Sequence, residues 1–194
     1  MHASIISTPA SVARKSGLTL AAHWLSALAV ILAFGLIWIR EALDEDALGK
    51  LLLAWHRQLG LLVLLLLAVR LIARWRQSQQ GQTLPPLLHC ASQATQWLFY
   101  LLLLAMPLLG WAMTSAQGHP LQLFNLAPLP PLLSVDPDLA DSLQEWHELG
   151  ATCLLGLIAL HVLAALWHHW LRRDGVLASM LPLVRPRSPR SFDH

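Results

Sequence analysis

Four long apolar segments, separated by shorter polar ones, dominate the pattern of hydrophobic and polar positions along this chain. They lie at about residues 18–39, 51–73, 97–116 and 149–171. An α-helix rises about 1.5 Å per residue, so about 20 apolar residues cross the roughly 30 Å of hydrocarbon in a bilayer. The strands of a membrane β-barrel are shorter and alternate in polarity, which these segments do not. The pattern therefore predicts an all-α integral membrane bundle of four helices.

The composition agrees with a membrane protein. Of the 194 residues, 56% are hydrophobic and only 12% are charged, whereas soluble domains have about 25% charged residues. A cleaved signal peptide is the competing interpretation of the first segment, because Arg14 and Lys15 precede it and Ala27-Leu28-Ala29 resembles a cleavage site. The apolar run continues through Trp38, which favours a retained helix.

The basic residues indicate the orientation of the bundle, because short loops rich in Lys and Arg stay in the cytoplasm. Most of them precede the first span, follow the second or follow the fourth (Arg14, Lys15, Arg70, Arg74, Arg76, Arg172, Arg173, Arg185, Arg187 and Arg190). The opposite loops carry Arg40, Lys50 and Arg57 among the acidic residues of 41–46 and 136–145. Both termini are therefore expected in the cytoplasm.

We expect one domain, residues 1–182, followed by a basic, proline-rich cytoplasmic tail at 183–194. Residues 77–96 are expected to form a polar cytoplasmic connector. The outer loop at about 117–137 is rich in both proline and leucine. It is expected to fold back as a lid on the bundle rather than form a regular helix. Asp136 and Pro137 supply capping signals for the start of the fourth helix.

Four histidines lie within or at the edges of the spans, where an ionisable side chain is costly and indicates a functional site. His147 and His161 are fourteen residues apart on the fourth span, which gives about 21 Å of rise on nearly the same helix face. Counted from the flanking basic residues, His23 lies near the depth of His161 and His56 near that of His147. Two imidazoles at one depth fill both axial positions of a haem iron, which favours electron transfer. The pattern therefore predicts two haems, held by His23 with His161 and by His56 with His147.

Other interpretations of these positions stay open. A single histidine at a membrane edge can simply hydrogen-bond to a neighbouring helix. Zinc or di-iron sites are a sharper rival, although they use cysteines or carboxylates. Arg57 either pairs with a haem propionate or extends its guanidinium to the membrane surface. His168 is either an alternative inner ligand or a residue near a quinone or a propionate. Gly60 and Gly150 either make room for a flat ring or serve helix packing.

Several motifs resemble those of the small bacterial cytochrome b561 family over about residues 14–182. They are TLAAHW at 19–24, WHRQLG at 55–60 followed by Arg70, SLQEWHE at 142–148, and Leu160-His161 with WHHW at 167–170 and Arg173-Asp174. The resemblance implies four helices and two b haems in the bacterial inner membrane. Its axial ligands fall on four positions of this chain: His23, His56, His147 and His161.

The resemblance further implies an oxidoreductase that takes electrons from superoxide on the outer side and reduces ubiquinone. Arg57, with Lys50 and Arg40, is expected to attract the superoxide anion, and the acidic outer residues oppose this effect. His168 and His169 are candidate contacts of the quinone. The alternative is a cytochrome b subunit that links a partner redox enzyme to the quinone pool, which the acidic outer loops favour because they suit a basic partner. No nucleic-acid partner is expected.

Overall fold

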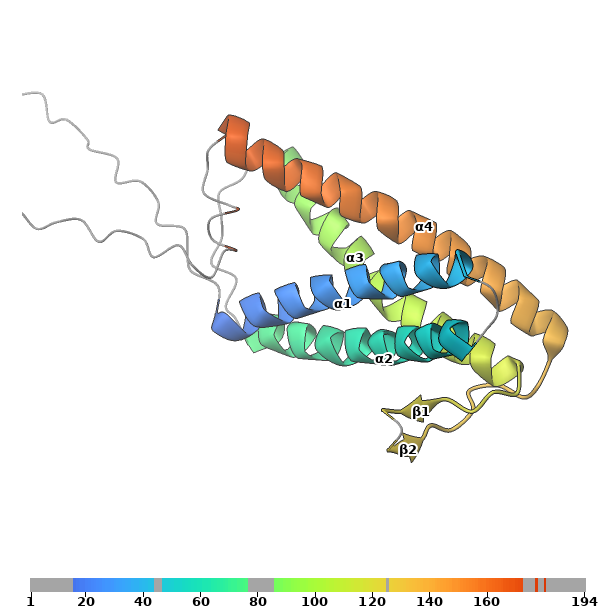
Figure 1. The fold of residues 1–194 in the computed structure, drawn as a ribbon. Coiled ribbons are helices and arrows are strands. Elements are labelled where there is room, and N and C mark those ends of the chain that lie inside the picture. The colour runs from blue at the N-terminus through green and yellow to red at the C-terminus, as the bar shows by residue number, and fades with distance from the viewer. Residues whose placement is uncertain are drawn as a thin grey trace, which may run out of the picture.

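A computed structural model describes residues 16–43, 47–76, 86–124 and 126–172, together with Leu177 and Met180. The described part contains four long helices: α1 (Gly17–Glu41), α2 (Ala47–Arg76), α3 (Pro86–Ala116) and α4 (Pro137–Trp167), which continues as the short π-helix η1 (His168–Arg172) (Figure 1). Each of the four is long and apolar enough to cross a membrane. The prediction of an all-α membrane bundle is confirmed. The predicted tail at 183–194 lies outside the described residues.

The helices form two antiparallel hairpins (Figure 1). α1 packs along α2, and α3 packs along α4, while α2 and α3 provide the main backbone contact between the hairpins. α4 approaches α1 and α2 less closely than these pairs approach one another. A small apolar core near the middle joins all four helices (Ala29, Val30, Val63, Leu67, Leu103 and Leu154). The interface of α4 with the first hairpin is therefore the loosest in the bundle.

Large apolar side chains cover much of the outer surface. Leu65, Leu101 and Leu163, from three different helices, are 59%, 60% and 64% exposed. Exposing these side chains to water would be unfavourable. Exposing them to lipid is not, because lipid chains are as apolar as leucine. The exposure pattern therefore agrees with helices that face the bilayer.

The ends of two helices have the caps that their sequences favour. The Ser16 side chain accepts a hydrogen bond from the Thr19 backbone nitrogen at 3.3 Å at the start of α1. At the start of α4, Asp136 accepts one from the Leu139 nitrogen at 3.0 Å, and Pro137 occupies the first turn. Each cap satisfies a backbone donor that has no partner within the helix. The predicted start of the fourth helix is confirmed.

The polar connector expected at 77–96 is wrong for residues 86–96, which form the first turns of α3. Pro86 suits the first turn of a helix, because its missing N–H needs no partner there. The polar side chains that follow find hydrogen bonds: Thr95 donates to the Ala91 carbonyl at 2.9 Å, and Gln93 contacts His89 at 3.3 Å. Polar composition therefore does not mark the end of this helix. Residues 77–85 lie outside the described residues.

The outer loop between α3 and α4 folds back on the bundle as expected. It contains a short antiparallel hairpin of β1 (Gln122–Leu123) and β2 (Ala127–Pro128). Gln58 of α2 holds this hairpin: its Nε2 donates to the Gln122 carbonyl and its Oε1 accepts from the Phe124 nitrogen, both at 2.8 Å. On the α3 side, Trp111 donates to the Pro130 carbonyl at 3.2 Å.

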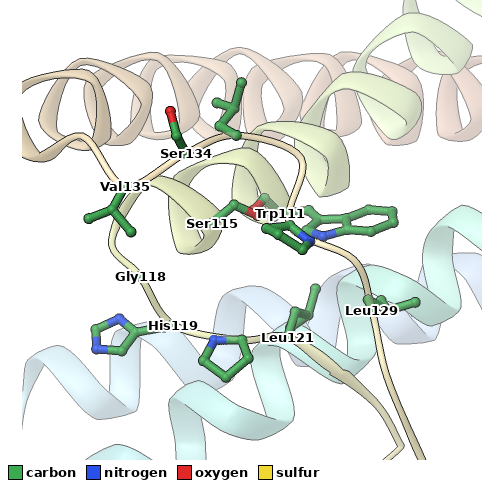
Figure 2. A pocket seen from close by; sticks show the side chains of 11 residues that line it. Trp111, Ser115, Gly118, His119, Leu121, Leu129, Ser134 and Val135 are labelled. Atoms are coloured by element: carbon green, nitrogen blue, oxygen red, sulfur yellow. The ribbon is translucent and has the colours of Figure 1, made fainter.

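A cavity of about 290 Å³ lies between this loop and the end of α3 (Figure 2). Its lining is mainly apolar (Trp111, Ser115, Gly118, His119, Pro120, Leu121, Leu129, Pro131, Leu133, Ser134 and Val135). None of the four histidines within the spans belongs to it.

Candidate haem sites

The outer histidine pair joins α2 to α4. The ring centroids of His56 and His147 are 6.2 Å apart, and the ring planes meet at 75°. His56 Nδ1 lies 3.0 Å from the Ala33 carbonyl oxygen of α1. Because a carbonyl oxygen only accepts, Nδ1 carries the proton and donates it. This hydrogen bond leaves the Nε2 lone pair of His56 available for a metal, because a hydrogen bond at one ring nitrogen fixes the tautomer and orientation of a histidine ligand.

His147 completes the outer pair from α4. Its Nδ1 is buried and has no hydrogen-bond partner of standard geometry in the described part of the chain, although the Met106 backbone is near enough to interact with the ring. A Cβ added to Gly110 of α3 would lie 3.4 Å from His147 Cε1, so the glycine gives the ring its room. A buried polar atom without a partner costs about 1–3 kcal/mol. The outer pair thus contains a ring nitrogen that the described residues alone do not satisfy.

The inner pair joins α1 to α4. The ring centroids of His23 and His161 are 6.3 Å apart, with the planes at 68°. Aromatic rings flank both histidines edge-to-face: Trp24 lies 5.4 Å from His23, and Phe99 of α3 lies 5.3 Å from His161. Trp24 also donates its indole N–H to the Met180 carbonyl at 2.8 Å, which fixes the ring. The inner pair therefore lies between aromatic rings supplied by α1 and α3.

Both spacings fit two imidazoles on opposite sides of one iron. A bond from a metal to an imidazole nitrogen is about 2 Å, and the ring centre lies about 1 Å behind that nitrogen, so the two centroids should be about 6 Å apart. The observed values are 6.2 and 6.3 Å. Both pairs also span the loosest interface of the bundle, between α4 and the first hairpin. The residues present thus fit a haem at each position.

The two glycines near the histidines differ in their surroundings. A Cβ added to Gly60 of α2 would meet nothing within 4 Å, so open space faces this position. A Cβ on Gly150 of α4 would lie 2.6 Å from Sδ of Met106 on α3. Gly150 therefore serves the close packing of α3 on α4, and only Gly60 keeps the interpretation of room for a flat ring.

The rival metal sites lack ligands in the parts of the chain that the structure covers. Among the described residues, no group of three or more His, Cys, Asp or Glu side chains lies together. Zinc and di-iron centres need at least that many ligands from such residues. The described residues therefore favour paired axial ligands over a site built only of side chains.

Arg57 follows His56 on α2 and lies at the outer site. Its Nε is buried and has no hydrogen-bond partner among the described residues. The structure also brings Arg40 of α1 near enough for the two charges to interact. Two cations close together favour the binding of an anion. This agrees with a contact of Arg57 to a haem propionate and with attraction of superoxide.

His161, and not a residue of the π-helix, faces His23 in the ring contact described above. His168 is half-buried and begins η1 directly after α4, and His169 is exposed. The sequence reasoning missed Gln58, Gly110 and Phe99. Of these, only Gln58 gave a signal, as a polar residue beside Arg57 in an apolar span.

A four-helix membrane bundle in which one helix presents two histidines to partners on two others is typical of a membrane cytochrome. Comparison with known proteins agrees with this class. Residues 14–183 match the family model described as prokaryotic cytochrome b561. The chain therefore belongs to the prokaryotic cytochrome b561 family, a family of membrane electron-transfer proteins that implies haem b.

Individual relatives cover most of the chain. It is similar to the probable superoxide oxidase CybB of Yersinia pestis, with 31% identity over 175 residues, which is 89% of this chain and 98% of the relative. It is 28% identical over 165 residues to cytochrome b561 homolog 1 of Escherichia coli K12, covering 82% and 92% of the two chains. It is also 28% identical over 171 residues to homolog 2 of the same organism, covering 87% and 91%. The resemblance found in the sequence motifs is confirmed.

Proposed function

We propose that this protein is a dihaem b-type cytochrome of the bacterial inner membrane that transfers electrons from superoxide on the outer side to ubiquinone. The observation that carries the proposal is the equal spacing of two histidine pairs, 6.2 and 6.3 Å between ring centroids, that share α4. Residues 1–182 form the cytochrome domain in this proposal, both termini are cytoplasmic, and 183–194 is a cytoplasmic tail.

The protein's part is to hold two redox groups at different depths. When bound, the haems supply reversible one-electron oxidation and reduction. His56 and His147 would hold the outer haem, and His23 and His161 the inner one. The fourteen residues between the two ligands of α4 correspond to about 21 Å along the helix. Leu154 lies halfway between these ligands within the apolar core, which excludes water from the space between the sites.

Superoxide is the proposed donor because the outer site offers positive charge to a small anion. Arg57 has a buried Nε without a partner among the described residues, and Arg40 lies close to it. A cationic entrance raises the encounter rate of an anionic substrate. Each of two superoxide anions loses one electron and leaves as dioxygen. Ubiquinone takes up the two electrons and two protons and becomes ubiquinol. His168 and His169 are the proposed quinone contacts at the inner end.

A second candidate function is that of a cytochrome b subunit which receives electrons from a partner enzyme. The first turns of α4 favour it, because their carboxylates are exposed (Asp138, Asp141, Glu145 and Glu148). Such an acidic surface suits a basic redox partner. This function needs the same four histidines but no superoxide chemistry at Arg57.

The test is to mix the purified, haem-loaded protein with a superoxide source and follow haem reduction by stopped-flow absorbance. We expect rapid reduction that superoxide dismutase abolishes, followed by reoxidation when a ubiquinone analogue is added. Arg57→Gln should slow the reduction several-fold and weaken its salt dependence, because one attracting charge is lost. Arg76→Gln, which removes the same charge at the other end of α2, should not. Failure of superoxide to reduce the haems would exclude the first function and leave the second.

A further inference from the structure

Two arginines of α2 and a tyrosine of α3 form a cluster at the inner end of the bundle, the end that carries His23 and His161. The guanidinium carbons of Arg70 and Arg74 lie 5.9 and 5.8 Å from the centroid of the Tyr100 ring. Arg74 also donates from Nη1 to the side-chain oxygen of Gln96. Both arginines are half-buried. The tyrosine and the glutamine thus hold two like charges in place, one helical turn apart.

No carboxylate of the packed helices balances these charges. Residues 47–135 contain no Asp or Glu, so α2 and α3 have none. The only acidic residue of α1 is Glu41, and those of α4 lie at 138–148, all at the opposite end. Like charges at positions i and i+4 of a helix repel, and a cation within a membrane span is costly without a partner. The helices α1 to α4 therefore supply no anion to this cluster.

The cluster lies near the depth of the inner histidine pair. Arg70 follows His56 by fourteen residues, as His161 follows His147, and α2 and α4 run in the same direction (Figure 1). Because equal helical rise gives equal depth, Arg70 lies near the level of His161. Tyr100 directly follows Phe99, whose ring is 5.3 Å from that of His161. An anion bound by Arg70 would therefore lie near the inner candidate haem site.

We propose that Arg70 and Arg74 bind the propionate carboxylates of the haem held by His23 and His161, an inference that rests on the proposed inner haem. Haem b carries two propionates on one edge, and a guanidinium donates two parallel hydrogen bonds to a carboxylate. A lipid phosphate offers the same oxyanion chemistry. Depth favours the propionate, because Arg70 lies six residues, about 9 Å, inward from Arg76 at the end of α2.

The experiment compares Arg70→Gln with Arg76→Gln in the purified, haem-loaded protein. Arg76 is exposed and provides a matched loss of one charge from the same helix. Spectroelectrochemical titration gives the two midpoint potentials, and redox-difference infrared spectroscopy on protein with ¹³C-labelled propionates gives the carboxylate bands. Both measurements report on the propionates without using the activity of the protein.

We expect Arg70→Gln to lower the potential of the inner haem, because a nearby positive charge favours the reduced form. For charges about 10 Å apart at an effective dielectric constant of about 20, the change is roughly tenfold in the reduction equilibrium, or about 59 mV for one electron. The label-sensitive carboxylate bands should shift in Arg70→Gln. Arg76→Gln should leave the bands unchanged and move the potential far less.

Unchanged bands and an unchanged inner potential in Arg70→Gln would overturn the inference. If both haems remain bound in that variant, the proposed function stands without it. If Arg70→Gln loses the inner haem, Arg70→Lys is measured instead. Lysine keeps the charge but not the two parallel hydrogen bonds, so the carboxylate bands of this variant should still shift, and unchanged bands would overturn the inference.

A second arm of the experiment uses neutral detergent with and without phosphatidylglycerol. An Arg70 effect that appears only with this anionic lipid would assign the site to a phosphate headgroup and contradict the proposal.

Discussion

Replacing Gln58 with alanine should release the β1–β2 hairpin from α2. The Gln58 amide makes two hydrogen bonds of 2.8 Å to the hairpin backbone, one to the Gln122 carbonyl and one from the Phe124 nitrogen. Each such bond contributes about 1 kcal/mol net. Loss of both bonds therefore shifts the free energy of hairpin opening by about 2 kcal/mol toward the open form. Since 1.4 kcal/mol is a factor of ten, the open population should rise roughly 30-fold. Gln58→Glu should raise it only about fivefold, because a carboxylate still accepts from Phe124 but no longer donates to Gln122.

Amide hydrogen exchange measures this opening directly. The Phe124 amide and the loop amides of Leu126 and Leu129, which donate within the hairpin at 2.9 and 2.8 Å, should exchange faster in the order wild type, Gln58→Glu, Gln58→Ala. Amides in the middle of α1 are the internal control and should not change. Equal exchange of the hairpin amides in all three proteins would refute the reasoning that Gln58 holds the outer loop.

Two further predictions concern matched glycine substitutions in α2 and α4, both checked by thermal unfolding in detergent. Gly60→Ala should stabilise the haem-free protein by about 0.5–1 kcal/mol, because alanine is the better helix former and its Cβ meets nothing within 4 Å. Gly150→Ala should stabilise it less than Gly60→Ala does, since the new Cβ would lie 2.6 Å from Sδ of Met106 and this flexible side chain must rotate away. Equal stabilisation at both positions would contradict the difference in packing.

The spans could be predicted from the sequence because the bilayer imposes a length and a polarity on any helix that crosses it. The start of α4 was predictable for a different reason: Asp136 and Pro137 carry local capping chemistry. The start of α3 was not, since residues 86–96 mix polar and apolar positions but are still helical. Hydropathy indicates which part of a helix lies in the hydrocarbon of the bilayer. It does not indicate where the helix ends outside the hydrocarbon.

The pairing of the histidines could be predicted by depth, because the rise of a helix is fixed, and the structure brings the rings of the predicted partners into edge-to-face contact. The contacts around them depend on how each helix is rotated and which neighbour it approaches. Three residues of α3 make such contacts: Gly110 against His147, Phe99 against His161 and Tyr100 against the arginine pair of α2. None of the four paired histidines lies on that helix, so nothing in the sequence indicated which of its faces meets the sites.

The haem content of the purified protein tests the central claim most directly, measured as haem b per polypeptide by the pyridine haemochrome spectrum. The two histidine pairs predict two haems per chain in the wild type and in His119→Ala, a control outside both pairs. His56→Ala and His161→Ala should each retain one. A wild-type ratio of one or none, or a full complement in either of the last two variants, would contradict the account.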